Sequence, residues 1–227
     1  MADSLIPKPR LVIVGASGHG LVVADIVRRA AGHEVVGFLD SGKPVGSGPA
    51  GLPILGRGED VAVLAREYGF TECLVAVGHN DTRRRCVQML SRMGPALRFP
   101  AVIHPSAVVA EGVTLGEGTV VMAGAVINPG CVIGRHCILN TGCRLDHEST
   151  LGDFASLAPG VVTGGNVSIG EGAAVCLGAQ IIHGIHIGAE AVVGSGALVL
   201  ADVPESWVVY GSPARRIRAR IPADHYM

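Results

Sequence analysis

Aromatic residues make up only 4% of this 227-residue chain, and its formal net charge of −1 leaves no excess of either sign. The low aromatic content argues against a wide hydrophobic interior, and the balanced charge provides no basic face for nucleic acid. No uncharged apolar run reaches the roughly 18 residues that a membrane span requires. The first ten residues contain two prolines and lack the apolar core of a signal peptide. We therefore expect a cytoplasmic protein that binds neither nucleic acid nor membranes.

Several common catalytic and metal-binding patterns are also missing. The six cysteines form no CxxC pair, and the sequence contains no Gly-x-Ser-x-Gly elbow. No histidines approach carboxylates or thiols at the spacing of metal ligands. A metal site and a covalent serine mechanism are therefore disfavoured.

What the chain does contain is glycine, 33 residues of it, and an aliphatic residue at every sixth position of its second half. A period of six matches neither a helix nor a flat strand and predicts a parallel β-helix of hexapeptide repeats. Thr163 alone departs from the aliphatic column. The column comprises Ile103, Val109, Leu115, Val121, Ile127, Ile133, Leu139, Leu145, Leu151, Leu157, Thr163, Ile169, Val175, Ile181, Ile187, Val193 and Val199.

Three hexads should close one triangular coil, so that residues 18 apart lie above one another at about 4.8 Å. A second column, four positions after each aliphatic residue, is small or β-branched and should also face inward. Cys131, Cys137 and Cys143 occupy this column, and we interpret them as reduced core residues.

The first hundred residues alternate apolar runs with helical patterns and predict a small α/β domain with a parallel sheet. The expected strands are 11–15, 35–39, 52–56, 73–77 and a short one at 97–99, and the expected helices are 21–29, 59–68 and one that contains Arg83 to Arg85. A glycine loop follows the first strand, in the form of a cradle for phosphate. We expect the nucleotide of a ligand here, although a glycine turn needed only for close packing is the alternative. The candidate contacts are Gly15, Ser17, Gly18, His19, Gly20, Asp40 at the end of the second strand, and His79 and Asn80 after a later strand.

The coil carries one dense polar segment, residues 139–148, which includes Asp146, His147 and Glu148. The spacing of 18 places Gly165 directly above His147. We interpret His147 as a general base oriented by Glu148 or Asp146, with Gly165 N–H facing a developing oxyanion; a solvated histidine at a turn is the alternative. His183 shares the column but should lie two coils away, about 10 Å, too far for direct partnership.

These motifs together resemble a known family over nearly the whole chain. They are Ile-Val-Gly-Ala-Ser-Gly-His-Gly at 13–20, Asn140, Asp-His-Glu at 146–148, Ala-Pro-Gly at 158–160, Gly164-Gly165 and Gly-Ser-Pro-Ala-Arg at 211–215. The sequence resembles hexapeptide-repeat sugar acyltransferases of the sialic-acid O-acetyltransferase type, including N-acetyltransferases of nucleotide-linked 4-amino-4,6-dideoxy sugars in bacillosamine and perosamine pathways. Some of these relatives carry a second histidine nine residues after the base, where this chain has Ser156.

The resemblance implies a left-handed β-helix, a homotrimer with active sites between subunits, and acetyl-CoA as co-substrate. The implied reaction is N-acetylation of the 4-amino group of a nucleotide-linked sugar. O-acetylation of a free sugar and a non-catalytic trimeric scaffold are the alternatives. By resemblance, the catalytic residues are His147, Glu148, Asn140 and Gly165, with Ser156 at the substrate, and the residues that contact acetyl-CoA are Gly165, Gly178, Gly196, Pro213 and Arg215.

Three domains are expected: an α/β nucleotide-sugar domain (1–100), the β-helix (101–204) and a C-terminal tail (205–227). We expect a turn at residues 211–215 and then the start of a basic helix at 215–221. This tail could cap the open end of the coil or meet the phosphates of CoA.

Overall fold

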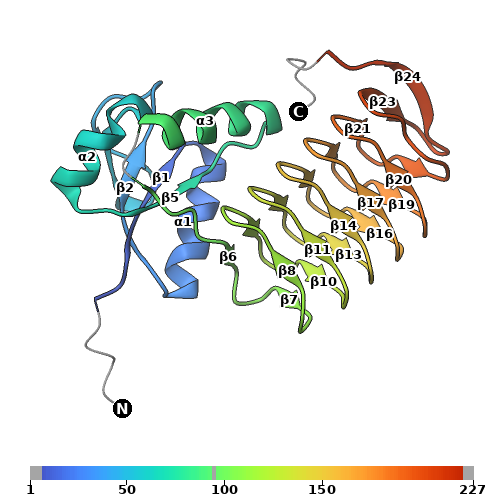
Figure 1. Ribbon diagram of the computed structural model, residues 1–227, viewed down its shortest axis with the longest axis horizontal. Coiled ribbons are helices and arrows are strands. Elements are labelled where there is room, and N and C mark those ends of the chain that lie inside the picture. The colour runs from blue at the N-terminus through green and yellow to red at the C-terminus, as the bar shows by residue number, and fades with distance from the viewer. Residues whose placement is uncertain (1–6, 94–95, 222–227) are drawn as a thin grey trace. The chain divides into compact units, whose positions relative to one another are not determined.

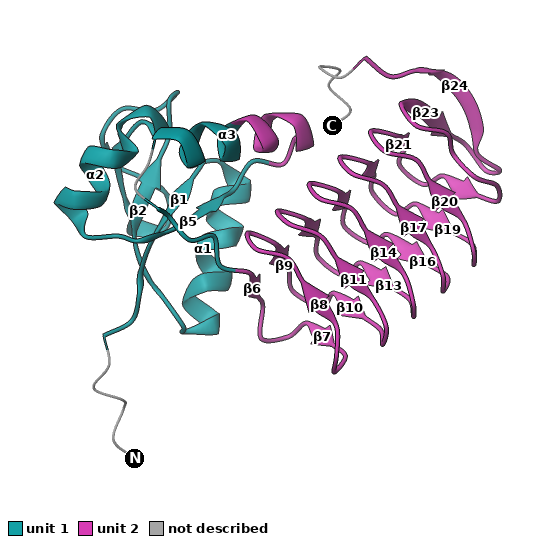
Figure 2. Ribbon diagram, in the orientation of Figure 1, with its two compact units in different colours: residues 1–77, 86–100 teal, residues 78–85, 101–227 magenta. Residues whose placement is uncertain are grey.

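The computed structural model describes residues 7–93 and 96–221, which divide into two compact units (Figure 2). The first unit comprises the residues up to Val77 together with Cys86–Pro100, and the second comprises Gly78–Arg85 together with the residues from Ala101 onward. A short segment from the first hundred residues therefore groups with the coil. None of the helices within the described residues has the length and apolarity of a membrane span.

A five-stranded sheet forms the first unit, in the order β3-β4-β2-β1-β5. Strand β1 lies parallel to β2 and β5 and is buried along Leu11–Val14, as its apolar run predicted. The expected strand at 97–99 is wrong, because Arg98 forms only an isolated bridge with Glu72. The elements are β1 (Arg10–Val14), α1 (Gly18–Ala30), β2 (Glu34–Leu39), β3 (Gly46–Ser47), β4 (Pro53–Gly56), α2 (Val61–Tyr68), β5 (Glu72–Val75) and α3 (Asn80–Met93), with short 3₁₀ turns at Pro49–Gly51 and Gly58–Asp60.

The second unit is a parallel β-helix of two-residue strands, seen as stacked coils in Figure 1. From β6 to β19, each strand pairs with the strand 18 residues further on, for example Val126 with Arg144, which confirms three hexads per coil. The strands form three sheets. They are β6 (Val102–Ile103), β7 (Val108–Val109), β8 (Thr114–Leu115), β9 (Val120–Val121), β10 (Val126–Ile127), β11 (Val132–Ile133), β12 (Ile138–Leu139), β13 (Arg144–Leu145), β14 (Thr150–Leu151), β15 (Ser156–Leu157), β16 (Val162–Thr163), β17 (Ser168–Ile169), β18 (Ala174–Val175), β19 (Gln180–Ile181), β20 (His186–Ile187), β21 (Val192–Val193) and β22 (Leu198–Val199).

The two predicted inward columns form the core of the coil, with the exception of Ile103 in the first coil, which is 36% exposed. Cys131, Cys137 and Cys143 are at most 1% exposed, which confirms their place in it. Burial raises the pKa of Cys137 and of Cys143 to about 12, so both are neutral thiols that act as small apolar residues.

One corner column of the coil receives side chains from the start of α3. The fully buried Arg83 donates to the carbonyl oxygens of His136 and Phe154, each at 2.8 Å, and Asn80 Nδ2 donates to those of Gly172 (3.1 Å) and Ala173 (3.0 Å). A buried guanidinium is stable only with such acceptors. These bonds explain why residues 78–85 group with the coil.

The C-terminal tail adds two strands, β23 (Trp207–Tyr210) and β24 (Arg215–Ala219), to the last coil. The expected helix at 215–221 is therefore wrong. Strand β23 extends the sheet in parallel, and its free edge pairs with β24 in an antiparallel hairpin. An edge strand rich in arginine discourages further strand addition, which suits the end of a solenoid.

The buried His136 should make stability depend on pH. Burial first, and the Arg83 and Arg135 cations second, lowers the pKa of His136 to about 4 from an ordinary value near 6.5. Between these values the unfolded chain takes up the proton and the folded chain does not, so stability falls as pH drops through this window. We expect His136→Asn, which tolerates the positive φ of 54° at this position, to flatten the fall by up to about 1.4 kcal/mol per pH unit. Urea unfolding at pH 7, 6 and 5 gives the free energy of unfolding at each pH. The same decrease of this free energy with pH in both proteins would contradict the prediction.

Candidate active site

His147 lies at the corner between β13 and β14, where its side chain is 48% exposed. Its Nδ1 is 3.1 Å from Glu148 Oε2, so that the carboxylate favours a hydrogen on Nδ1 and leaves Nε2 as the basic nitrogen. This contact selects Glu148, of the two carboxylates considered, as the group that orients the ring.

Gly165 lies directly above His147, as the spacing of 18 predicted. A Cβ at Gly165 would overlap Nε2 and Cε1 of the imidazole. The backbone of Gly165 is not in the left-handed region, so this glycine is needed for space rather than for conformation. The ring of His147 occupies the volume that a side chain there would fill.

Asp146 supports the main chain of this corner instead of the ring. Its Oδ1 accepts from Asn128 Nδ2 (2.6 Å) and from the backbone N–H of His147 (2.8 Å). These two hydrogen bonds, the Asn128 bond foremost, lower the pKa of Asp146 below its ordinary value. The carboxylate therefore stays ionised and fixes the position from which His147 projects.

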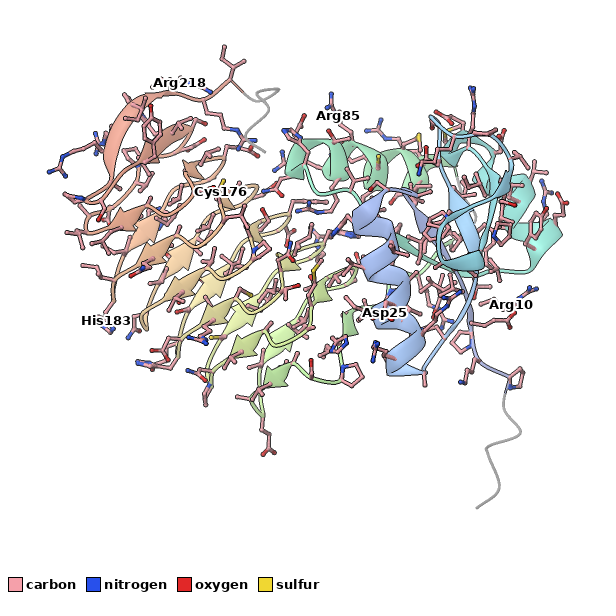
Figure 3. All side chains as sticks on the ribbon, turned by 180° about the vertical axis from the view of Figure 1, so that it is seen from behind. Arg10, Asp25, Arg85, Cys176, His183 and Arg218 are labelled. Atoms are coloured by element: carbon pink, nitrogen blue, oxygen red, sulfur yellow. The ribbon has the colours of Figure 1, made fainter. Side chains whose placement is uncertain are left out.

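His183 is closer to His147 than the sequence suggested. The two ring centroids are 6.2 Å apart and the ring planes are tilted by 46°, so the expectation of about 10 Å is wrong. Gly165 lies between them and has no side chain, which lets the two imidazoles lean toward each other. Figure 3 shows His183 projecting from the edge of the coil.

Asn140 and Ser156 line a groove of about 340 Å³ on a different corner of the coil from His147. Gly178 and Gly196 belong to the same corner column, adjacent to the groove residues Leu177 and Ser195, and are exposed. Burial raises the pKa of Cys176 in this groove to about 11, which rules out a thiolate nucleophile at neutral pH. The lining residues are Asn140, Ser156, Ala158, Pro159, Ala174, Val175, Cys176, Leu177 and Ser195.

A second hollow, of about 200 Å³, lies at the end of the coil and includes Arg215 and Arg216. Pro213 is exposed in the turn between β23 and β24. Asp202 also lines the hollow, so the two arginines leave it an excess of one positive charge that favours an anionic group.

In the first unit, the expected glycine loop is shorter than predicted, because α1 already begins at Gly18 after Ser17 at its N-cap position. Gly15 has a φ of +101° and lies against the Ala76 carbonyl, and a Cβ on Gly20 would overlap the Gly15 oxygen. Close packing therefore requires both glycines. The N-terminus of the 13-residue α1 still directs its N–H groups toward this loop, as an anion site needs.

Asp40 is engaged with the loop itself. Its two carboxylate oxygens accept from Ala16 N (2.8 Å) and Gly42 N (2.9 Å). Lys43, which the sequence reasoning missed, donates from Nζ to the Ala16 carbonyl and adds a cation beside the loop. Its position three residues after Asp40 is the feature of the sequence that could have identified it.

Three further candidates from the first hundred residues are partly or fully buried. His19 is half-buried in the first turn of α1. His79 is 7% exposed, and its Nδ1 is 3.2 Å from Thr82 Oγ1. Asn80 is completely buried, with Nδ2 on the coil carbonyls and Oδ1 accepting from Arg83 (2.8 Å). These contacts give Asn80 a structural role. Within residues 7–93 and 96–221, no three histidine, cysteine or acidic side chains are grouped to hold a metal ion.

Comparison with known proteins places this arrangement in context. The family model of the PglD N-terminal domain matches residues 10–90, and that of the bacterial transferase hexapeptide (six repeats) matches residues 112–147. The structure of PerB from Caulobacter crescentus, in complex with CoA and GDP-perosamine, is 36% identical and covers 95% of this chain and 99% of its own, with a TM-score of 0.85. The chain belongs to the hexapeptide-repeat sugar acetyltransferases. Its coil is accordingly the left-handed β-helix expected from the resemblance.

Other relatives agree with this assignment to the sugar acetyltransferases. The acetyltransferase domain of PglB from Neisseria gonorrhoeae FA1090, in complex with acetyl coenzyme A, is 33% identical and covers 92% of this chain and 100% of its own, with a TM-score of 0.84. Serine acetyltransferase 2 of Arabidopsis thaliana is 40% identical over 84 residues, which is 34% of this chain and 26% of that protein. The chain thus spans about a quarter of the length of this curated relative.

The steric role of Gly165 generates a test. We expect Gly165→Ala to push the imidazole of His147 out of place and to lower kcat by about 10- to 100-fold, because small displacements of a catalytic group are costly. The thermal midpoint should change little, since the backbone conformation suits alanine. Gly32→Ala, in open space and also without a positive φ, is the matched control. The rate of CoA release measures the effect. An unchanged kcat in Gly165→Ala would contradict the prediction that the added Cβ displaces the His147 ring.

Proposed function

We propose that this protein transfers an acetyl group from acetyl-CoA to the 4-amino group of a nucleotide-linked 4-amino-4,6-dideoxy sugar. The observation that carries the proposal is the pair His147–Glu148, held under Gly165, in a chain that matches PerB over 95% of its length. PerB is a perosamine N-acetyltransferase, and variants of it with asparagine or alanine in place of one histidine have been solved with CoA and GDP-perosamine.

The reaction is a direct attack on the thioester. The sugar amine, in its neutral form, forms a bond to the thioester carbonyl carbon while His147 Nε2 accepts a proton from the nitrogen. Glu148, on Nδ1, stabilises the imidazolium that results. The tetrahedral oxyanion takes a hydrogen bond from Gly165 N–H, and its collapse breaks the carbon–sulfur bond. CoA leaves as the thiolate and takes the proton from the His147 imidazolium, which restores the neutral base, and the amide is the product.

A homotrimer with active sites between subunits supports this chemistry. Asn140 and Ser156 line their groove on one corner, and His147 projects from the next, with strand β13 between the two corners. When the groove of a neighbouring subunit lies against His147, the acetyl-CoA bound in that groove is close to the base. Apolar side chains that remain 42–61% exposed on the coil, among them Val108, Leu177 and Ile182, supply contact surface for such an assembly.

The nucleotide, in this proposal, is held by the N-terminal domain expected over residues 1–100, through the loop at Gly15, the N-terminus of α1 and Lys43. Acetyl-CoA lies along the β-helix (101–204), past Gly178 and Gly196, and its phosphates meet Arg215 in the tail (205–227). The reaction uses cytoplasmic metabolites, in keeping with a cytoplasmic enzyme.

Replacing the base tests the mechanism. His147→Ala should lower kcat by about 10²- to 10⁴-fold and leave the KM for acetyl-CoA within a few-fold, because a general base contributes mainly to the transition state. His104→Ala removes another histidine of the coil, whose Nδ1 bonds to Ser106 of its own turn, and should retain activity. Both proteins should have the same mass by light scattering. Turnover of His147→Ala within a few-fold of the parent, in an intact oligomer, would refute the mechanism.

A substrate panel tests the reaction class. Release of CoA should require a nucleotide-linked 4-aminosugar, and GDP- and UDP-sugars should be compared side by side. Free sialic acid and hydroxy sugars should give no turnover; a reversal of this preference would favour O-acetylation. Calorimetric binding of a nucleotide sugar without any thioester cleavage across the panel would favour a non-catalytic scaffold instead.

A further inference from the structure

Thr163 is the exception in the aliphatic column of the coil, and it is buried, with 4% of its surface exposed. A hydroxyl in a core of valine, leucine and isoleucine is unfavourable unless it is hydrogen-bonded. Its Oγ1 accepts the backbone N–H of Asp146 at 3.1 Å. Asp146 directly precedes His147, so the one polar residue of this column reaches the corner that carries the candidate base.

That hydrogen bond replaces a regular bond of the coil. From His104 to Ile182, the N–H of every sixth residue other than Asp146 donates to the main-chain carbonyl 17 positions further on, as in Asn140 to Leu157 (2.9 Å) and Gly152 to Ile169 (2.7 Å). Asp146 N–H goes to the side chain of Thr163 instead. In agreement, β13 and β16 share the single residue pair Arg144–Val162, whereas β10 and β13 share two.

We propose that Thr163 is a positioning residue for His147. The Thr163 hydroxyl, in place of the regular ladder bond, holds the corner formed by Asp146, His147 and Glu148. The proposal rests on the proposed role of His147 as the base. The hydroxyl accepts the Asp146 N–H, so this corner does not need the main-chain bond that sets the distance between the other coils. The His147 ring can then lie across Gly165, with Nε2 directed to the substrate.

Other hydrogen bonds hold the same corner from the coil below, from the coil above and from within its own turn. Asn128 fixes the Asp146 carboxylate (2.6 Å), and the His147 carbonyl accepts from Asn166 N (2.9 Å) and from Ser149 Oγ (3.3 Å). Thr163 supplies a further bond from the coil above, to the Asp146 N–H. Without it, the Asp146 N–H can form the regular ladder bond to the main-chain carbonyl of residue 163, and this shift moves His147.

Thr119 is an internal comparison. It is completely buried, accepts Cys137 N–H (3.0 Å) and donates to the Gly134 carbonyl (2.8 Å), at a corner remote from His147 in the chain. A core hydroxyl that merely stabilises the coil is therefore available in the same molecule, which separates stability from positioning.

The experiment compares Thr163→Val, Thr163→Ser and Thr119→Val. Thr163→Val restores the aliphatic column, so its thermal midpoint should be equal to or above that of the parent, while kcat falls about 10-fold and the KM for acetyl-CoA stays within twofold. Thr163→Ser keeps the hydroxyl and should recover kcat to within about threefold. Thr119→Val should lower the thermal midpoint and leave kcat within twofold.

Two results would overturn the proposal: kcat of Thr163→Val within twofold of the parent, or joint loss of kcat and stability that serine does not rescue. A crystal structure of Thr163→Val adds a readout that needs no substrate. A displaced His147 ring supports the proposal, and an unmoved ring contradicts it. If the parent protein itself acetylates nothing on the sugar panel, the proposed function fails, while the position of the ring still decides the role of Thr163.

Discussion

Main-chain hydrogen bonds between successive coils set the geometry on which the candidate site depends. Each links a residue to the coil above, as Asn128 N does with the Leu145 carbonyl at 3.0 Å, and together they hold residues 18 apart at about one strand spacing. Two of the six positions in each hexad are thereby committed to the core. Chemistry is confined to the corners, where side chains point outward and their composition is free to vary.

This spacing is too short for two full side chains above one another to share a corner and leave room for a substrate. His147 resolves the conflict by lying across Gly165, whose missing side chain provides the space. The carboxylate of Glu148 and the amide of Asn128 act on different parts of the corner, one on the ring and one, through Asp146, on the main chain. The site is thus prepared before substrate binds, which is what efficient proton transfer needs.

The sequence allowed the coil to be predicted well, because a period of six and a spacing of 18 are properties of the main chain. The same arithmetic placed Gly165 over His147 correctly. It overestimated the distance between His147 and His183, since it counted coil spacings and ignored the length of the two side chains, which extend toward each other past Gly165. It also misjudged the tail, where five residues that include three arginines pair as an edge strand because the last coil offers a free edge. Asn80 was predicted to contact the ligand and Arg83 only to lie in a helix; their hydrogen bonds to the coil were not foreseen, since the acceptors lie 53 to 93 positions away.

The contacts that the sequence could not reveal have a common physical origin. The ladder uses nearly all main-chain donors and acceptors of the coil, so a polar side chain buried there must find its partner at a corner or displace a ladder bond. Arg83 takes the first course, at the carbonyls of two corner residues with positive φ, His136 and Phe154. Thr163 takes the second, at Asp146. In a regular solenoid, a break in the hydrogen-bond register therefore marks a place where the chain does something other than stack, and the break at Asp146 adjoins the candidate base.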